Sequence, residues 1–207
     1  MIQTKIFSVD DPNTIPSAMT ALSANELIVF PTETLYGLAS QINEISLQKI
    51  YTAKQRPEEK AIPVLLGNLE QLNELVSEIK PEVLALMNAF WPGPLTLVMP
   101  KKNGLPKSLT PYPGLAVRMP DHPFALNLLQ QTGPLAVTSA NISGGQNPST
   151  VEEVYAQLNE HVSLIIDAGV NPGGKASTIV DCQGKLPVLL REGPIPFEKI
   201  LEVWKRA

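Results

Sequence analysis

A short apolar run that stops abruptly at a proline is the feature that most constrains this chain. Ile28-Val29-Phe30 has the length and composition of a buried strand, and Pro31 ends it. The polar residues Thr32, Glu33 and Thr34 follow, with Gly37 shortly after. In an open α/β sheet, residues beyond the carboxyl end of a strand face the ligand crevice, so we expect a pocket floor with Gly37 allowing close backbone approach. The alternative is a proline-led turn capped by threonines.

Composition bounds the class of protein. A chain of 207 residues with 43% hydrophobic residues is long enough for one globular domain with a substantial core. Its apolar runs are strand-sized, and no signal peptide is recognised at the start, so we expect a cytoplasmic protein. The single cysteine, Cys182, excludes an internal disulfide, and His122 and His161 are too far apart in sequence to favour a metal site. The net charge of −4 argues against a protein built to coat nucleic acid.

Apolar runs of strand length alternate with helical periodicities along the whole chain, which predicts an α/β fold. The expected strands are 2–9, 27–30, 62–66, 95–99, 115–120, 135–137, 163–167, 177–181 and 187–191. The expected helices are 15–22, 44–55, one capped by Asn68 with an apolar face reaching Ile79, 81–90, 123–131, one capped by Ser149 with Glu152, and a closing helix around 197–204.

Three cations converge where the helix 44–55 ends. Lys54 occupies a position where the apolar stripe of that helix asks for a hydrophobic residue, and Arg56 and Lys60 follow closely. One interpretation is a set of cations favoured by a helix C-terminus, and the other is a clamp for an anion.

Other polar groups recur where predicted strands end. Arg118 lies in an otherwise apolar strand, which indicates either an edge position or a bound anion. Ser139 and Asn141 begin a segment rich in small polar residues and glycine, which is typical of an anion-binding nest or of a tight turn. Ser177 and Arg191 complete the set. Their recurrence predicts one anion-binding pocket.

Two loops have competing interpretations. Residues 169–175 match Gly-x-x-x-x-Gly-Lys, but Ala176 replaces the hydroxyl residue of a P-loop and a strand rather than a helix is expected next, so we reject that motif. Residues 101–114 form a long loop rich in proline, glycine and lysine, for which we expect a functional or mobile role.

The motifs PTETLYG, KQRP, WPGPLTLV, AVRMP, TSANISG, STIVD and LREG occur in the order found in the YrdC-like family, which this chain resembles from about Leu22 to Gly193. The resemblance implies a single domain over 1–207 with a twisted mixed α/β sheet flanked by helices around a cationic cavity. It implies an L-threonylcarbamoyladenylate synthase, a nucleotidyltransferase that converts L-threonine, bicarbonate or CO2, and ATP to threonylcarbamoyl-AMP and pyrophosphate. This is the first step towards N6-threonylcarbamoyladenosine in tRNA.

The resemblance also implies roles for particular residues. It assigns ATP binding to Lys54, Arg56, Lys60, Asn141 and Arg191, threonine binding to Thr34, Arg118, Ser139 and Ser177, and catalysis to Lys54, Arg56, Ser139 and Asn141. Mg2+ would arrive with ATP, since no dedicated carboxylate cage is visible. The chain departs from many long members at Leu65, where those members have a histidine.

The partners implied are ATP, L-threonine, bicarbonate or CO2, and a tRNA threonylcarbamoyl-transferase complex that receives the product, with weak RNA binding besides. Two alternatives to the synthase are a double-stranded RNA-binding or ribosome-maturation module and a YciO-like paralogue. The acidic balance and the 5% content of aromatic residues disfavour the RNA module.

Overall fold

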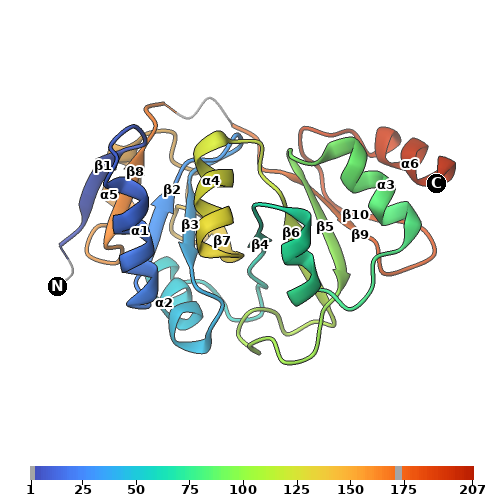
Figure 1. The fold of residues 1–207 in the computed structure, drawn as a ribbon, viewed down its shortest axis with the longest axis horizontal. Coiled ribbons are helices and arrows are strands. Elements are labelled where there is room, and N and C mark those ends of the chain that lie inside the picture. The colour runs from blue at the N-terminus through green and yellow to red at the C-terminus, as the bar shows by residue number, and fades with distance from the viewer. Residues whose placement is uncertain (1–2, 171–173) are drawn as a thin grey trace.

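The computed structural model describes residues 3–170 and 174–207 (Figure 1). Ten strands within these residues form a single sheet. The strands are β1 (Lys5–Ser8), β2 (Ile28–Phe30), β3 (Gly37–Ser40), β4 (Val64–Leu65), β5 (Leu95–Pro100), β6 (Gly114–Arg118), β7 (Leu135–Ser139), β8 (Leu164–Asp167), β9 (Thr178–Asp181) and β10 (Val188–Arg191). The helices are α1 (Thr14–Ser23), α2 (Glu44–Lys54), the short 3-10 helix η1 (Leu69–Glu74), α3 (Pro81–Phe90), α4 (Pro123–Thr132), α5 (Val151–Leu158) and α6 (Phe197–Arg206).

The sheet mixes parallel and antiparallel pairs in the order β1-β8-β2-β3-β7-β4-β6-β5-β9-β10. Strands β1 and β2 run parallel to β8, β4 runs parallel to β6, and β5 runs parallel to β9, whereas the remaining neighbours are antiparallel. The predicted mixed α/β sheet flanked by helices is therefore confirmed.

One face of the sheet carries the larger hydrophobic core. Leu97, Val117, Val64 and Ala136 pair across four neighbouring strands and so point to the same side, where they are fully buried. Buried residues of α2, α3, α5 and α6 belong to the same core. These four helices therefore pack on this face.

The opposite face is covered only in part. Helices α1 and α4 contribute the buried residues Leu22 and Leu128 to a second core that includes Phe30 and Leu135. Figure 1 shows α4 beside β3 and β7, whereas α1 lies against β8 and β2. The side chains that β5, β6 and β9 direct to this face line a cavity instead.

The strand β3 was missed by the sequence analysis, which predicted an irregular pocket floor up to Gly37 and no strand after it. All four residues of β3 are buried, and the strand lies between β2 and β7. A side chain at position 37 would place its Cβ 2.7 Å from Cγ1 of Val137, so this strand begins where only glycine fits. This four-residue strand has one large apolar residue, Leu38, among three small ones, so it does not show the alternation that identifies a strand in sequence.

Two helix starts or lengths also differ from the prediction. The helix capped by Asn68 is only the 3-10 turn η1, because Val76 leaves it to form an antiparallel bridge with Lys101. Helix α5 is capped by Thr150 rather than Ser149, and Glu153 accepts a hydrogen bond from the Ser149 amide at 2.7 Å. Hydroxyl residues and glutamates both come in adjacent pairs here, so the capping pattern fits two registers.

Candidate functional site

A cavity of about 660 Å³ lies on the partly covered face of the sheet. Its floor is made by alternate residues of three strands, which point to the same side: Thr96 and Val98, Ala116 and Arg118, Ile179 and Asp181. The sequence analysis placed the pocket beyond the carboxyl ends of strands, and the cavity does include Thr34 and Ser139 at such ends, but its floor lies over a face of the sheet. Ser177, predicted as the first residue of a strand, directly precedes β9.

Three arginines line this cavity: Arg56, Arg118 and Arg191. Arg191 pairs with Ile179 across β10 and β9, and Ile179 pairs with Thr96 of β5, which brings Arg191 to the row of the sheet occupied by Thr96. Arg191 is exposed at the cavity, yet desolvation by the surrounding wall and then the charge of Arg118 lower its pKa. Two guanidinium groups that repel one another across an open cavity form a natural site for an anion.

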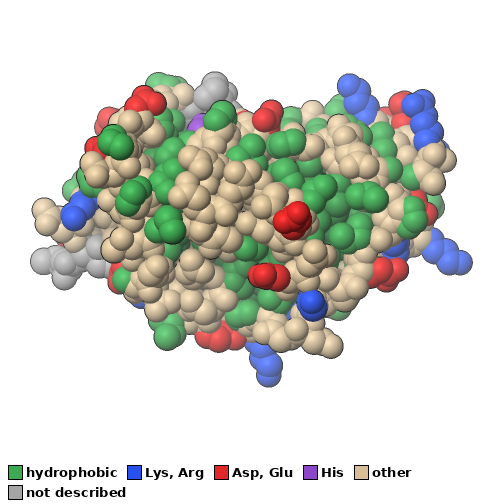
Figure 2. All heavy atoms as spheres, viewed as in Figure 1, with side chains coloured by type: hydrophobic (Ala, Val, Ile, Leu, Met, Phe, Trp, Pro, Cys, Tyr) green, Lys and Arg blue, Asp and Glu red, His purple; other side chains and the backbone are tan. Residues whose placement is uncertain are grey.

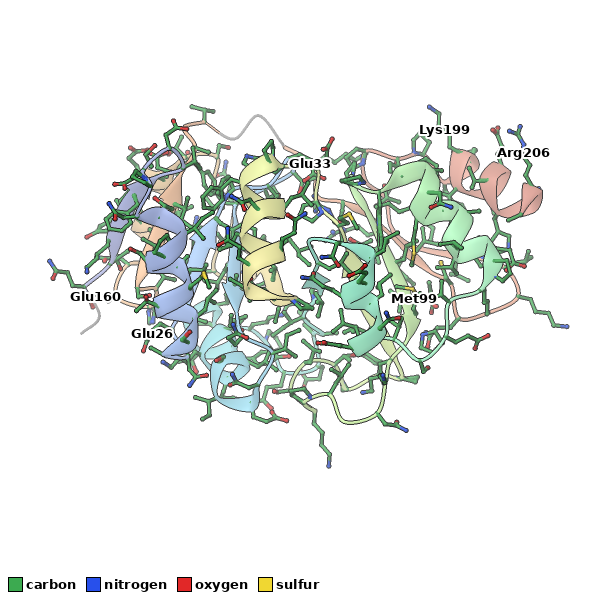
Figure 3. All side chains as sticks on the ribbon, viewed as in Figure 1. Glu26, Glu33, Met99, Glu160, Lys199 and Arg206 are labelled. Atoms are coloured by element: carbon green, nitrogen blue, oxygen red, sulfur yellow. The ribbon has the colours of Figure 1, made fainter. Side chains whose placement is uncertain are left out.

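Arg118 is fixed on three sides. Its Nε donates to the carbonyl of Gly93 at 3.1 Å, Nη1 donates to Oγ1 of Thr34 at 2.9 Å, and Nη2 forms an ion pair with Glu33 at 2.5 Å. Burial lowers the pKa of Arg118, and Glu33 opposes that shift. Figure 3 shows Glu33 beside the upper end of α4. Because an arginine has five N–H donors, these three contacts leave two of them unused.

Ser177 is, like Arg118, a buried polar residue near Arg191. Its hydroxyl lies 2.8 Å from Oγ1 of Thr96, and Arg191 donates to the Ser177 hydroxyl at 3.1 Å and to its carbonyl at 3.0 Å. Gly193 makes this approach possible, since a Cβ there would lie 2.2 Å from the backbone nitrogen of Thr178. Ser177 therefore lines the same cavity as Thr34 and Arg118. The resemblance assigned these three residues to one substrate, which requires that they lie in one cavity.

Lys54 lies beneath the segment that starts at Ser139. Its side chain is 1% exposed and is not among the groups that line the cavity. The ammonium donates to the carbonyl of Ser139 at 2.5 Å and to the carbonyl of Asn141, and its nitrogen lies 3.4 Å from Oδ1 of Asn141. Burial, and then the charge of Arg56, lower the pKa of Lys54 to about 7. In this structure Lys54 thus holds the backbone of the loop.

Ser139 and Asn141 are bonded to one another above this lysine. Ser139 Oγ, which lies in the cavity wall, donates to Asn141 Oδ1 at 2.5 Å. Asn141 Nδ2 donates to the carbonyls of Ile142 and Gly145 at 2.9 and 2.8 Å. The loop is therefore closed on itself, and of this pair only Ser139 reaches the cavity.

The remaining predicted residues differ in their access to the cavity. Arg56 lines it and donates to the carbonyls of Lys60 and Ala61 at 3.2 and 2.8 Å. The Lys60 side chain is exposed and does not belong to the cavity wall. Leu65 is buried and does line the cavity, at the position where many long members of the resembled family have histidine.

The loop 101–114 is anchored at its centre and reaches the cavity at its end. Glu44 accepts hydrogen bonds from the Lys107 amide at 2.8 Å and from the Ser108 hydroxyl, and Tyr51 donates to the Ser108 carbonyl at 2.7 Å. Tyr112 lines the cavity, which supports a functional role for the loop.

Several cavity residues were not identified from the sequence, namely Thr96, Tyr112, Asp181 and Gln183. Side-chain alternation could have found Asp181, because Ser177, Ile179 and Asp181 occupy alternate positions of the predicted strand 177–181. It could not have found Thr96, since no site residue was predicted on the strand 95–99. Within residues 3–170 and 174–207, no group of three His, Cys, Asp or Glu side chains could hold a metal ion. In the same part of the chain, no helix is long and apolar enough to cross a membrane. Of the segment 169–175, residues 171–173 lie outside the described residues.

Comparison with known proteins gives concordant results. Residues 20–193 match the Sua5_yciO_yrdC family model, described as "Telomere recombination". The threonylcarbamoyl-AMP synthase of Bacillus subtilis is 40% identical over 93% of this chain and 57% of its own length. Pyrococcus abyssi Sua5, solved in complex with L-threonine, superposes with a TM-score of 0.92 and 38% identity over 97% of this chain and 61% of its own. Escherichia coli YciO superposes with a TM-score of 0.85 and 27% identity, covering 97% of this chain and all of YciO. This chain thus spans little more than half the length of the two synthase-type relatives.

Proposed function

Because the chain belongs to the Sua5/YciO/YrdC family, we propose that it is an L-threonylcarbamoyl-AMP synthase that uses L-threonine, bicarbonate or CO2, and ATP. The observation that carries this proposal is a single cavity lined by Arg56, Arg118 and Arg191 together with Thr34 and Ser177. Three cations suit a triphosphate and a carboxylate, whereas the hydroxyls suit a small hydroxy amino acid. The relative crystallised with L-threonine and the synthase from B. subtilis support the same reaction.

The chemistry requires alignment of two anions more than a protein nucleophile. The threonine amine takes up CO2 to form a carbamate, a carbamate oxygen attacks the α-phosphorus of ATP, and pyrophosphate leaves. Such a transfer depends on positioning and on neutralisation of phosphate charge. We assign the phosphates to Arg56 and Arg191, and the threonine carboxylate to Arg118, which lines the cavity and has two N–H donors that its contacts with Gly93, Thr34 and Glu33 do not use.

The hydroxyl groups and the lysine have supporting roles in this proposal. Thr34, Ser139 and Ser177 would hydrogen-bond threonine, with Ser139 also near the reacting phosphate. Lys54 would act through the loop that it holds, and Asn141 would keep that loop closed. Mg2+ would arrive bound to ATP and neutralise its phosphates, since Asp181 is the sole acidic side chain among the described cavity residues. The family resemblance places Lys60 with ATP, which would require its exposed side chain to turn inward.

The proposed reaction also suggests where the protein acts and what receives its product. We propose that residues 1–207 act as one domain in the cytoplasm and pass threonylcarbamoyl-AMP to a tRNA threonylcarbamoyl-transferase complex. A YciO-like activity on a related nucleotide is the second candidate, favoured by the TM-score of 0.85 to that protein. An RNA-binding module is less well supported. Most Lys and Arg side chains in Figure 2 lie at the periphery of the face in view, which offers no continuous basic surface for a backbone of phosphates.

Pyrophosphate release tests the proposal. We expect release to require ATP, L-threonine and bicarbonate together, so that omission of any one reduces it to background. Threonylcarbamoyl-AMP should appear in equal amount to pyrophosphate. Release at the same rate without threonine would overturn the synthase assignment and favour the YciO-like alternative.

A further inference from the structure

The two carbonyls that hold the Arg56 side chain lie at the end of an exposed segment. The guanidinium donates to the carbonyls of Lys60 and Ala61 at 3.2 and 2.8 Å, and we call these two carbonyls the cradle. Residues 57–60, which lead into the cradle, are all exposed. A segment with so few buried side chains has little packing of its own to fix it. The direction of the Arg56 side chain therefore depends on what holds the cradle from outside.

Tyr51 connects the cradle to helix α2 and to the loop 101–114. Its carbonyl accepts from the Arg56 amide at 2.9 Å. Its hydroxyl donates to the Ser108 carbonyl at 2.7 Å and lies 3.3 Å from the Lys60 carbonyl. Tyr51 is only 4% exposed, so its ring is fixed by the hydrophobic core. The hydroxyl thus lies between the loop and the cradle.

The loop is fixed in turn by Glu44, at the other end of α2. The Glu44 carboxylate accepts from the Lys107 amide at 2.8 Å and from the Ser108 hydroxyl. The next residue, Leu109, is fully buried, and its carbonyl accepts from the amide of Ile62 at 2.9 Å, directly after the cradle. The loop therefore joins the start of α2 to the segment that follows Arg56.

We propose that Glu44, Tyr51 and Ser108 form a brace that positions Arg56 from outside the cavity. None of these three residues lines the cavity, so they are positioning residues rather than catalytic ones. The inference rests on the proposed function, because it takes Arg56 as a group that binds phosphate. Arg118 has separate anchors in Gly93, Thr34 and Glu33, so the brace does not extend to the residue assigned to threonine.

Tyr51→Phe keeps the buried ring and removes only the hydroxyl. Because a small misplacement of a charge-stabilising group is costly, kcat for threonine-dependent pyrophosphate release should fall about 10-fold, with the KM for threonine unchanged. Tyr155→Phe, at an exposed tyrosine on α5, is the matched control and should keep full kcat.

A double-mutant cycle separates positioning from a general loss of packing. In the Arg56→Ala protein, Tyr51→Phe should cause no further loss of kcat, because the group that the brace positions is absent. The same loss in both backgrounds would mean that Tyr51 acts independently of Arg56, and it overturns the proposal.

Glu44→Ala tests the outer end of the brace at an exposed residue, outside the core. Loss of its hydrogen bonds should lower kcat about 5-fold, again only when Arg56 is present. Glu44 also lies in the first turn of α2, where a carboxylate favours the helix, so Glu198→Ala in the first turn of α6 is the matched control and should keep full kcat. Full kcat in folded Tyr51→Phe or in Glu44→Ala overturns the brace.

Binding of inorganic pyrophosphate, measured by titration calorimetry, separates the brace from the synthase assignment. Tyr51→Phe should bind pyrophosphate about 10-fold more weakly than the unaltered protein does, and L-threonine equally well. Absence of threonine-dependent pyrophosphate release from the unaltered protein overturns the synthase, and pyrophosphate binding then still decides the brace. An unaltered protein that binds no pyrophosphate overturns the assignment of Arg56 to phosphate, and the brace with it.

Discussion

Replacement of Lys54 by methionine should remove one proton from the pH dependence of stability. The pKa of Lys54 is lowered from 10.5 to about 7, first by burial and then by the charge of Arg56. Between these two pKa values the unfolded chain binds one more proton than the folded protein, so the free energy of unfolding rises with pH. The slope is about 1.4 kcal/mol per pH unit for one proton.

Urea unfolding of the unaltered protein and of Lys54→Met, monitored by circular dichroism, measures this slope. Between about pH 7.5 and about pH 9.5, the unaltered protein should gain about 2 to 3 kcal/mol relative to Lys54→Met. Other titrating groups, such as Tyr36, contribute equally to both proteins and cancel in the difference. Lys60→Met is the matched control, because Lys60 is exposed, and it should follow the unaltered protein.

Parallel stability curves for the unaltered protein and Lys54→Met would refute this reasoning. They would mean that the oxygen atoms of Ser139 and Asn141 around the ammonium hold its proton more strongly than burial disfavours it. At low pH, Lys54→Met removes the cost of a buried charge but leaves two buried carbonyls without that donor, at about 1–3 kcal/mol each. The pH slope, rather than the stability at one pH, therefore separates the two effects.

Two further predictions concern the arginines. Arg118→Lys keeps a positive charge beside Glu33 but loses the planar fork, so the KM for threonine should rise about 10-fold or more while the KM for ATP stays unchanged; equal increases in both would contradict the carboxylate assignment. Arg56→Ala should lower kcat by about 100-fold, as for a lost charge-stabilising donor, and should cost about 1–2 kcal/mol in urea unfolding because two backbone carbonyls lose their partner. Full activity in folded Arg56→Ala would exclude a role at the phosphates.

The order of strands and helices was predictable because most elements carry strong periodicities and clear breaks. Pro81 and Pro123 each begin a helix where the sequence places it. The failures fall where local rules compete. Strand β3 has only one large apolar residue, Leu38, and therefore shows no pattern, and Val76 fits both the apolar stripe of a helix and a bridge with Lys101. The register of Lys101 with Val76 is a long-range contact, which periodicity does not encode.

The site was predicted less completely, and Lys54 shows why. The sequence left two interpretations of Lys54 open, a cation at a helix C-terminus and part of an anion clamp, and the family resemblance assigned it to ATP. The helical pattern shows that the position is buried but not what lies above it. In the structure the carbonyls of Ser139 and Asn141, more than eighty residues away, surround its nitrogen. The fold alone decides whether a buried cation meets a ligand or the backbone.

The sequence analysis expected polar residues at strand ends to meet in one pocket, and Arg118 and Ser177 do line one cavity. The reason is not that the carboxyl ends of the strands share an edge. In a mixed sheet the carboxyl ends of strands do not share an edge, yet β6 is antiparallel to β5 and β5 is parallel to β9, so the end of β6 and the start of β9 meet. The alternation of side chains along β6 identifies a further residue on this face. If Arg118 faces a ligand, so does Ala116, and the pairing of Ala116 with Val98 and of Val98 with Asp181 brings a carboxylate to the same face. Asp181, which the sequence analysis did not identify, therefore lies two steps of register from Ala116, the neighbour of a residue that it did identify.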